Sequence, residues 1–203
     1  MKRLLPLVPV LLLFVTGCTT SPPRDMDNVC NIFREKDGWY DDAADAREEW
    51  GSPISVMMAI IHQESRFQAK AKPPRKKILG FIPGPRPSSA YGYSQAKKST
   101  WAEYKRSAGR YGADRDDFAD AIDFVGWYNY QSKRRSGISR KDPYRLYLAY
   151  HEGHGGYNRA TYRKKPWLTT VARKVEARAG TYRSQLLQCE EELEDDGWFF
   201  GWF

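Results

Sequence analysis

The sequence has 203 residues with a formal net charge of +8 at pH 7, and 41% of the residues are hydrophobic. This length suits a single globular domain with additional segments at its ends. Six acidic residues are concentrated in 190–196, so the rest of the chain is more basic than the net charge indicates and should attract polyanions.

The N-terminus has the organisation of a secretory signal. A basic start is followed by an apolar run (LLPLVPVLLLFV) that is short for a transmembrane helix, and residues 15–18 (VTGC) resemble the lipobox of bacterial lipoproteins. The resemblance predicts a signal peptide over 1–17 and a lipidated Cys18 whose acyl chains anchor the protein in a membrane. An ordinary signal peptide and a buried apolar segment are the alternatives.

Thr19 follows the predicted lipidated cysteine, where Asp would favour the inner membrane in enteric lipoproteins. We therefore expect the periplasmic face of the outer membrane, with the inner membrane as the less favoured alternative. This compartment excludes nucleic acid as a partner, which leaves anionic lipid headgroups and peptidoglycan as polyanions for the basic body. A generally solvated basic surface is the other interpretation.

Two cysteines remain in a protein predicted to be secreted, Cys30 and Cys189. An even pair in an oxidising compartment predicts a disulfide that joins the two ends of one domain, and two buried thiols are the alternative. Residues 18–30 include TTSPPRDMD and are predicted to be a flexible tether. The domain itself is expected over 31–189.

Helical patterns dominate the domain, and no segment has the alternating pattern of a half-buried strand over any length. The fold class predicted is therefore all-α. Between two of the predicted helices, residues 71–89 (AKPPRKKILGFIPGPRPSS) form a long basic loop rich in proline, with an apolar tip that either contacts a membrane or glycan or packs on its own domain. The predicted helices are 40–50, 53–67, 96–107, 116–133, 142–151 and 167–188.

The second of these helices carries a carboxylate at an unusual place. Ser52 and Pro53 provide a start signal, and Ile54, Met57, Met58 and Ile61 form an apolar stripe. Glu64 continues this stripe at the last turn, where burial and the negative end of the helix dipole raise the pKa of a carboxyl. A carboxyl protonated near neutral pH is suited to general acid catalysis, and a solvated glutamate at a helix end is the alternative.

Three motifs in order, ESRF at 64–67, AYGYSQ at 90–95 and AYHEGHGGY at 149–157, resemble those of the family-1 lytic transglycosylases. The resemblance implies a lysozyme-like fold and cleavage of the β-1,4 bond between N-acetylmuramic acid and N-acetylglucosamine in peptidoglycan, with formation of a 1,6-anhydromuramyl end. It makes Glu64 the only catalytic acid and base. It also places the Tyr150 hydroxyl close to Glu64. The substrate-binding residues predicted are Ser65, Gly92, Tyr93, Gln95, Trp127, Tyr128, Tyr150, His151 and Gly153.

The sequence departs from the family pattern at several positions. Tyr93 and Ser94 stand where the family has Leu-Met, and His151 stands where it has Asn. Trp127 occupies the place of a glycine in a loosely matching helix. The aromatic residues Tyr91, Tyr93, Trp127 and Tyr128 are candidates for stacking on sugars, and core packing is the alternative for each.

Other chemistries are weighed on particular residues. Glu152 or Asp123 as a second carboxylate would make a hydrolytic muramidase of the goose-lysozyme kind, and a lipoprotein that binds peptidoglycan without cutting it is a further alternative. The segment HEGH lacks the spacing of the zinc-protease motif, so we expect neither a metal site nor a cofactor. The tail 190–203 combines acids with aromatics and is interpreted as docking on the basic body, entering a membrane interface or binding an envelope protein, with a disordered end as the alternative.

Overall fold

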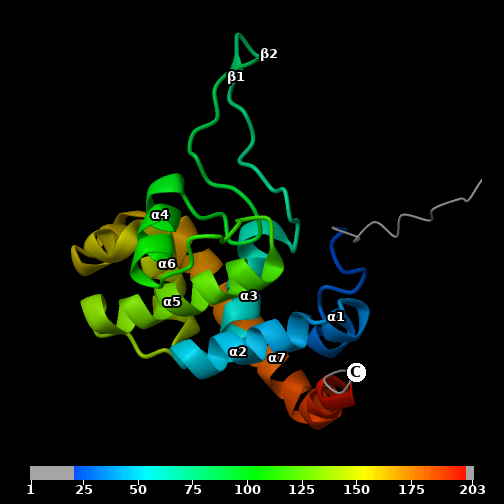
Figure 1. Ribbon diagram of the computed structural model, residues 1–203. Coiled ribbons are helices and arrows are strands. Elements are labelled where there is room, and N and C mark those ends of the chain that lie inside the picture. The colour runs from blue at the N-terminus through cyan, green and yellow to red at the C-terminus, as the bar shows by residue number, and fades with distance from the viewer. Residues whose placement is uncertain (1–20, 200–203) are drawn as a thin grey trace, which may run out of the picture.

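The computed structural model describes residues 21–199, with side chains described for 21–194. The predicted signal peptide 1–17 and Cys18 lie outside this part of the chain. The all-α prediction is confirmed, because helices form the whole body and the only strands in the described region are two short ones in the loop (Figure 1). The elements are α1 (Val29–Glu35), α2 (Trp39–Trp50), α3 (Ile54–Ser65), β1 (Lys77–Ile78), β2 (Ile82–Pro83), α4 (Lys98–Ser107), α5 (Phe118–Ser136), α6 (Pro143–Asn158), a 3-10 turn (Thr161–Lys164) and α7 (Pro166–Phe199).

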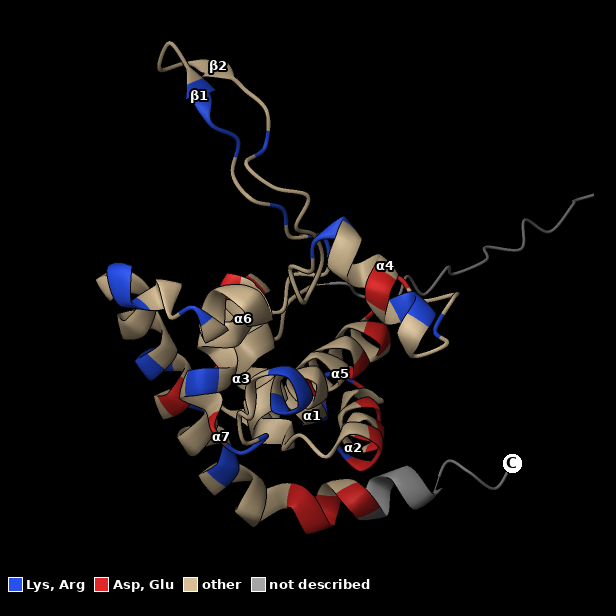
Figure 2. Cartoon of the chain, turned by 90° about the vertical axis from the view of Figure 1, so that its left-hand side faces the viewer, with Lys and Arg blue, Asp and Glu red and all other residues tan. Residues whose placement is uncertain are grey.

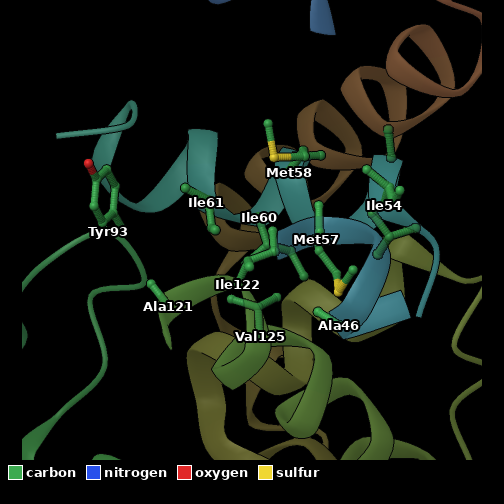
Figure 3. Close-up of a cluster of buried hydrophobic side chains, with 14 of the residues drawn as sticks. Ala46, Ile54, Met57, Met58, Ile60, Ile61, Tyr93, Ala121, Ile122 and Val125 are labelled. Carbon is green, nitrogen blue, oxygen red and sulfur yellow. The ribbon is translucent and has the colours of Figure 1, made fainter. Parts of the chain in front are cut away.

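Helix α3 is the central element of the core. Every residue from 54 to 62 is buried, so the helix is enclosed all round by α2, α5 and α7 and does not present a single stripe to the core as the sequence pattern predicted. Figure 3 shows Ile60 of α3 directed toward Ile122 and Val125 of α5, and Met57 directed toward Ala46 of α2. A helix held on all sides gives its last turn a well-defined position.

The start of α3 differs from the prediction. Pro53 is the capping residue and the helix begins at Ile54, without a side-chain hydrogen bond at the cap. The prediction that Ser52 caps this helix is wrong. Its hydroxyl is buried and accepts a hydrogen bond of 2.9 Å from Nδ2 of Asn129, which ties α5 to the start of α3.

The described part of the predicted tether packs on the domain. Helix α1, which the sequence analysis did not predict, buries Val29, Ile32 and Phe33. Upstream of it, Nζ of the buried Lys36 donates to the carbonyl oxygen of Ser21 at 2.7 Å. The prediction of a free tether is therefore wrong for residues 21–30, because local hydrogen bonds and apolar contacts hold this segment to the helical body.

The predicted disulfide is confirmed between Cys30 of α1 and Cys189 of α7. Helix α7 does not end there but continues through Phe199, past the predicted start of the tail. The first acids of the tail dock on α1 and α2. Glu192 pairs with Arg34 at 2.6 Å, while Glu190 pairs with Arg47. Docking is thus confirmed for residues 190–194, and the aromatic end lies outside the described side chains.

The loop at 71–89 forms an arm that projects from the body (Figure 1). Its strands pair antiparallel, with Ile78 opposite Ile82 and Lys77 opposite Pro83. The alternative in which this loop packs on its own domain is excluded for its tip, which is exposed. Within the described residues, no helix has the length and apolarity needed to cross a membrane.

Candidate active site

The three motifs meet at one cleft of about 420 Å³ between the end of α3, the base of the arm, α5 and α6. Glu64 comes from the first motif, Gln95 from the second, and Tyr150, His151 and Gly153 from the third. Chain segments separated by some 90 positions thus converge around one carboxyl. The other lining residues are Pro73, Ala90, Ala96, Lys97, Thr100, Phe124, Tyr128 and Glu152.

Glu64 lies in the last turn of α3 and is partly buried. The helix ends at Ser65 because Arg66 and Phe67 adopt left-handed backbone conformations, with φ of 51° and 58°. Phe67 is fully buried against Trp39, which holds this strained turn in place. Burial raises the pKa of Glu64 to about 7, against a contact with the Tyr147 hydroxyl that lowers it. The carboxyl is therefore protonated in a large fraction of molecules near neutral pH.

Two tyrosines of α6 lie near Glu64, and the sequence predicted only Tyr150. The residue whose hydroxyl contacts the Glu64 carboxyl is Tyr147. The Tyr150 hydroxyl instead donates to the backbone carbonyl of Ser94 at 2.6 Å, so it ties the third motif to the second. The Tyr150 hydroxyl nevertheless lies close enough to Glu64 for the two groups to interact electrostatically, as the sequence predicted. Tyr147 lies three residues before Tyr150 on the same helical face, and this spacing was the available signal.

The second motif forms a tight turn at the base of the arm. Gly92 has φ of +79°, and a Cβ atom there would lie 1.8 Å from the carbonyl oxygen of Arg115, so only glycine fits. Gln95 closes the turn, because its Nε2 donates to the carbonyls of Ala71 at 3.0 Å and Gly92 at 2.8 Å. Gln95 lines the cleft, and Gly92 shapes it from the buried side.

Three residues predicted to bind substrate are buried away from the cleft. Ser65 is 7% exposed and donates to the carbonyl of Ile61 at 3.2 Å. Tyr93 packs edge-on against Trp39, and Trp127 is 2% exposed within an aromatic cluster of α4 and α5. The prediction that these side chains contact sugar is wrong, because they are buried and contact other residues of the core.

Tyr128 is largely buried but still lines the cleft. Its hydroxyl donates to the carbonyl of Ala149 at 3.2 Å, and its ring stacks on His154 at 4.5 Å between centroids. His154 is held in turn by Ser132, whose hydroxyl is 2.9 Å from Nε2. This layer supports the floor of the cleft.

The third motif bends α6 at the cleft. Gly153 has φ of 72° and ψ of 157°, which interrupts the helix directly after Glu152. Burial alone would raise the pKa of Glu152, but hydrogen bonds from Lys165, Thr161 and His151 outweigh it and lower the pKa to about 2. Lys165 Nζ lies 2.7 Å and His151 Nδ1 3.0 Å from the carboxylate. Glu152 is therefore an ionised structural anchor of the bend.

Asp123, the other candidate second carboxylate, does not line the cleft. It accepts a hydrogen bond of 2.6 Å from Nε1 of Trp50 and is also bound by the Tyr104 hydroxyl and Arg110. Within residues 21–194, no group of three His, Cys, Asp or Glu side chains is arranged to hold a metal ion.

Comparison with known proteins identifies the family. A search of curated proteins found no match. A family model described as "Transglycosylase SLT domain" matches residues 6–189, which is most of the chain. Together with the helical body and the cleft that joins the three motifs, this match shows that the chain belongs to the transglycosylase SLT domain family, with its lysozyme-like all-α fold, and is a peptidoglycan lytic transglycosylase.

Proposed function

We propose that the protein cleaves the β-1,4 bond between N-acetylmuramic acid and N-acetylglucosamine without water, with Glu64 as the only catalytic acid and base. The observation that carries this proposal is the difference between the two carboxyl groups in the cleft. The pKa of Glu64 is raised to about 7, whereas Glu152 is bound by three donors and its pKa is lowered to about 2. Of these two carboxyl groups, only Glu64 is able to hold and release a proton at neutral pH.

The reaction proceeds in two proton transfers. Protonated Glu64 donates to the glycosidic oxygen, so the bond to C1 of the muramyl residue breaks and the glucosamine leaves with a free 4-hydroxyl group. The muramyl N-acetyl carbonyl oxygen stabilises the positive charge at C1. The Glu64 carboxylate then takes the proton of the muramyl 6-hydroxyl, whose oxygen forms the new bond to C1. Glu64 ends protonated as it began, and no water is consumed.

A hydrolytic muramidase is the main alternative, since most glycosidases use a pair of carboxyl groups. Both candidates for the second carboxyl are engaged elsewhere. Glu152 is occupied by Lys165, Thr161 and His151, and Asp123 lies outside the cleft. Because neither carboxyl group is placed to act on the substrate, the arrangement favours the mechanism in which the substrate supplies its own nucleophile.

A protein that binds peptidoglycan without cutting it is the other alternative. Such a protein would gain nothing from a desolvated carboxyl, which costs folding free energy. Among the described residues, no cation lies within ion-pair distance of Glu64. An uncompensated acid in a cleft is typical of catalysis.

The analysis of glycan ends tests the mechanism. Purified sacculi are digested with the native protein or with the Glu64→Gln variant, and the fragments are identified by mass spectrometry. We expect anhydromuramyl ends, each lighter by one water than a reducing end, from the native protein only. Reducing ends alone would establish hydrolysis, and equal digestion by the variant would remove Glu64 from the mechanism.

We further propose that Cys18 carries the lipid and holds the enzyme at the periplasmic face of the outer membrane, on the basis of VTGC and Thr19. Ser21, three residues after Cys18, is already held to the domain by Lys36, so this anchor would hold the body close to the lipid surface. Metabolic labelling with a radioactive fatty acid should mark the native chain and leave the Cys18→Ser variant unlabelled. Separation of the two membranes on a density gradient then tests the location, and recovery of the labelled chain in the inner membrane would contradict it.

A further inference from the structure

The arm at residues 71–89 is not explained by the active site. Its tip exposes four large apolar side chains, Ile78, Leu79, Phe81 and Ile82, which are 50%, 79%, 74% and 43% exposed. The described residues hold few other large apolar side chains that are so open to solvent. Contiguous apolar exposure of this kind marks an interaction site.

The backbone places these side chains at the far end of the arm. Leu79 and Gly80 have φ of 52° and 81°, which reverses the chain tightly between β1 and β2. No heavy atom lies within 4 Å of the position of a Cβ on Gly80, so the turn is free of the body. Figure 1 shows the strands well beyond the helices that support them.

Positive charge lies behind the apolar tip. From Ser65 to Ala102 the sequence contains no Asp or Glu, and the arm in Figure 2 carries only basic and uncharged residues. Arg86 donates to the carbonyl of Pro73, which joins the two sides of the arm near its base. The cations of this stretch around the tip are Lys70, Lys72, Arg75, Lys76, Lys77 and Arg86.

We propose that the arm is a membrane-insertion element whose tip enters an anionic lipid surface end-on. The order of the residues along the arm matches the depth profile of a bilayer, with apolar groups foremost for the acyl region and cations behind them for the phosphates. Burial of the four side chains in lipid removes apolar area from water, and the cations add electrostatic attraction to anionic headgroups. The acid-free charge pattern selects lipid over a protein partner, whose surface would offer mixed charges.

Insertion of the arm does not depend on the role of Glu64, but it would affect the cleft. Pro73 and Ala90 stand at the two ends of the arm and line the cleft that holds Glu64. Insertion of the tip would therefore set the height and orientation of the cleft above the membrane. Glycan strands at that height would be the ones presented to the enzyme.

A position-specific probe tests the proposal in the full chain. An environment-sensitive fluorophore is attached to Leu79→Cys, and for comparison to Leu187→Cys, since Leu79 and Leu187 are 79% and 78% exposed. Cys30 and Cys189 are joined in the disulfide, and the parent chain treated with the same reagent gives the background labelling. The proteins are reconstituted in phosphatidylcholine vesicles with or without phosphatidylglycerol.

On vesicles with phosphatidylglycerol, we expect the emission at position 79 to shift to shorter wavelength and to be quenched by lipid-borne quenchers, while position 187 keeps the emission of a probe in water. Replacement of Lys76 and Lys77 by Gln should lower the ratio of inserted to free arm roughly thirtyfold. A probe at 79 that stays in water on these vesicles would overturn the proposal. So would shielding that occurs only when envelope proteins are added, which would assign the tip to a protein partner.

Discussion

Glu64 and Glu152 line the same cleft, and their surroundings displace their pKa values in opposite directions. Glu64 is desolvated, and this burial raises its pKa to about 7 although the contact with the Tyr147 hydroxyl lowers it. Glu152 receives hydrogen bonds from Lys165, Thr161 and His151, so its pKa falls to about 2. Two acids of identical chemistry are thereby separated into a proton donor and a structural anion.

The first prediction concerns the pH dependence of the reaction. Catalysis begins from protonated Glu64, so kcat/KM should be level on the acid side and fall about tenfold per pH unit above a pKa of about 7. Glu152 is ionised over the whole range from pH 4 to 9 and adds no further limb. Release of anhydromuropeptides from sacculi at fixed ionic strength measures the profile. A rate that climbs steadily to pH 9 would contradict the assignment.

The second prediction is that Glu64 costs stability when it is ionised. Its pKa is about 7 in the folded protein, above the 4.5 of an ordinary glutamate, so the contribution of Glu64 to the unfolding free energy should be fully present below pH 4.5 and be lost as pH rises through 7. The loss is about 3 kcal/mol if the whole shift is realised. The Glu64→Gln variant cannot ionise, and we expect it to be more stable than the native protein at pH 8 by about that amount.

Denaturant unfolding at pH 8 and pH 4 measures this difference. At pH 4 both proteins carry a neutral group at position 64, so their stabilities should nearly coincide. Glu152→Gln is the opposite control. The pKa of Glu152 is lowered by folding, so its ionised carboxylate stabilises the native protein above pH 4, and the variant should lose this stability. Equal stability of Glu64→Gln and native protein at pH 8 would show that the Glu64 carboxylate is well solvated.

The third prediction separates the two tyrosines of α6. The Tyr147 contact lowers the pKa of Glu64, so Tyr147→Phe should raise that pKa and move the alkaline limb of kcat/KM to higher pH. Tyr150→Phe removes the bond to the Ser94 carbonyl and should lower kcat/KM at every pH without moving the limb. The two pH profiles are the measurement. An unmoved limb in Tyr147→Phe would leave the tyrosine with a packing role only.

The sequence was sufficient to predict the all-α class, the disulfide and the position of Glu64. The helices and the position of Glu64 depend on the local spacing of apolar residues, and the disulfide depends on there being only two cysteines to pair. Apolar spacing along 54–64 places the carboxyl on a buried helix, and two remaining cysteines have only one partner each.

The details that failed depend on contacts between distant segments. Trp127 and Tyr128 are adjacent aromatics in the sequence, yet only the second reaches the cleft, because successive residues of α5 face different directions. Tyr147, whose hydroxyl contacts Glu64, was not predicted as a site residue, because the register of α6 against α3 cannot be derived from the sequence. Residues 21–30 have the composition of a linker, and their attachment depends on α7 and on Lys36.

The last prediction tests the turn that carries the second motif. In Gly92→Ala the new Cβ would meet the backbone carbonyl of Arg115 at 1.8 Å in a left-handed conformation, so the turn must move. Gly109→Ala is the matched control, since Gly109 has φ of +71° with nothing within 4 Å of its Cβ position. The control should lose about 1 kcal/mol of unfolding free energy from backbone strain alone. Gly92→Ala should lose about 3 kcal/mol or more, together with most of its activity.

The turn holds Gln95 in the cleft, and the Ser94 carbonyl in the turn accepts a hydrogen bond from the Tyr150 hydroxyl. Displacement of the turn therefore separates the second motif from the third. Denaturant unfolding and anhydromuropeptide release measure both effects. Equal losses in the two variants would mean that the Arg115 carbonyl yields at little cost and that the shape of the cleft does not depend on this glycine.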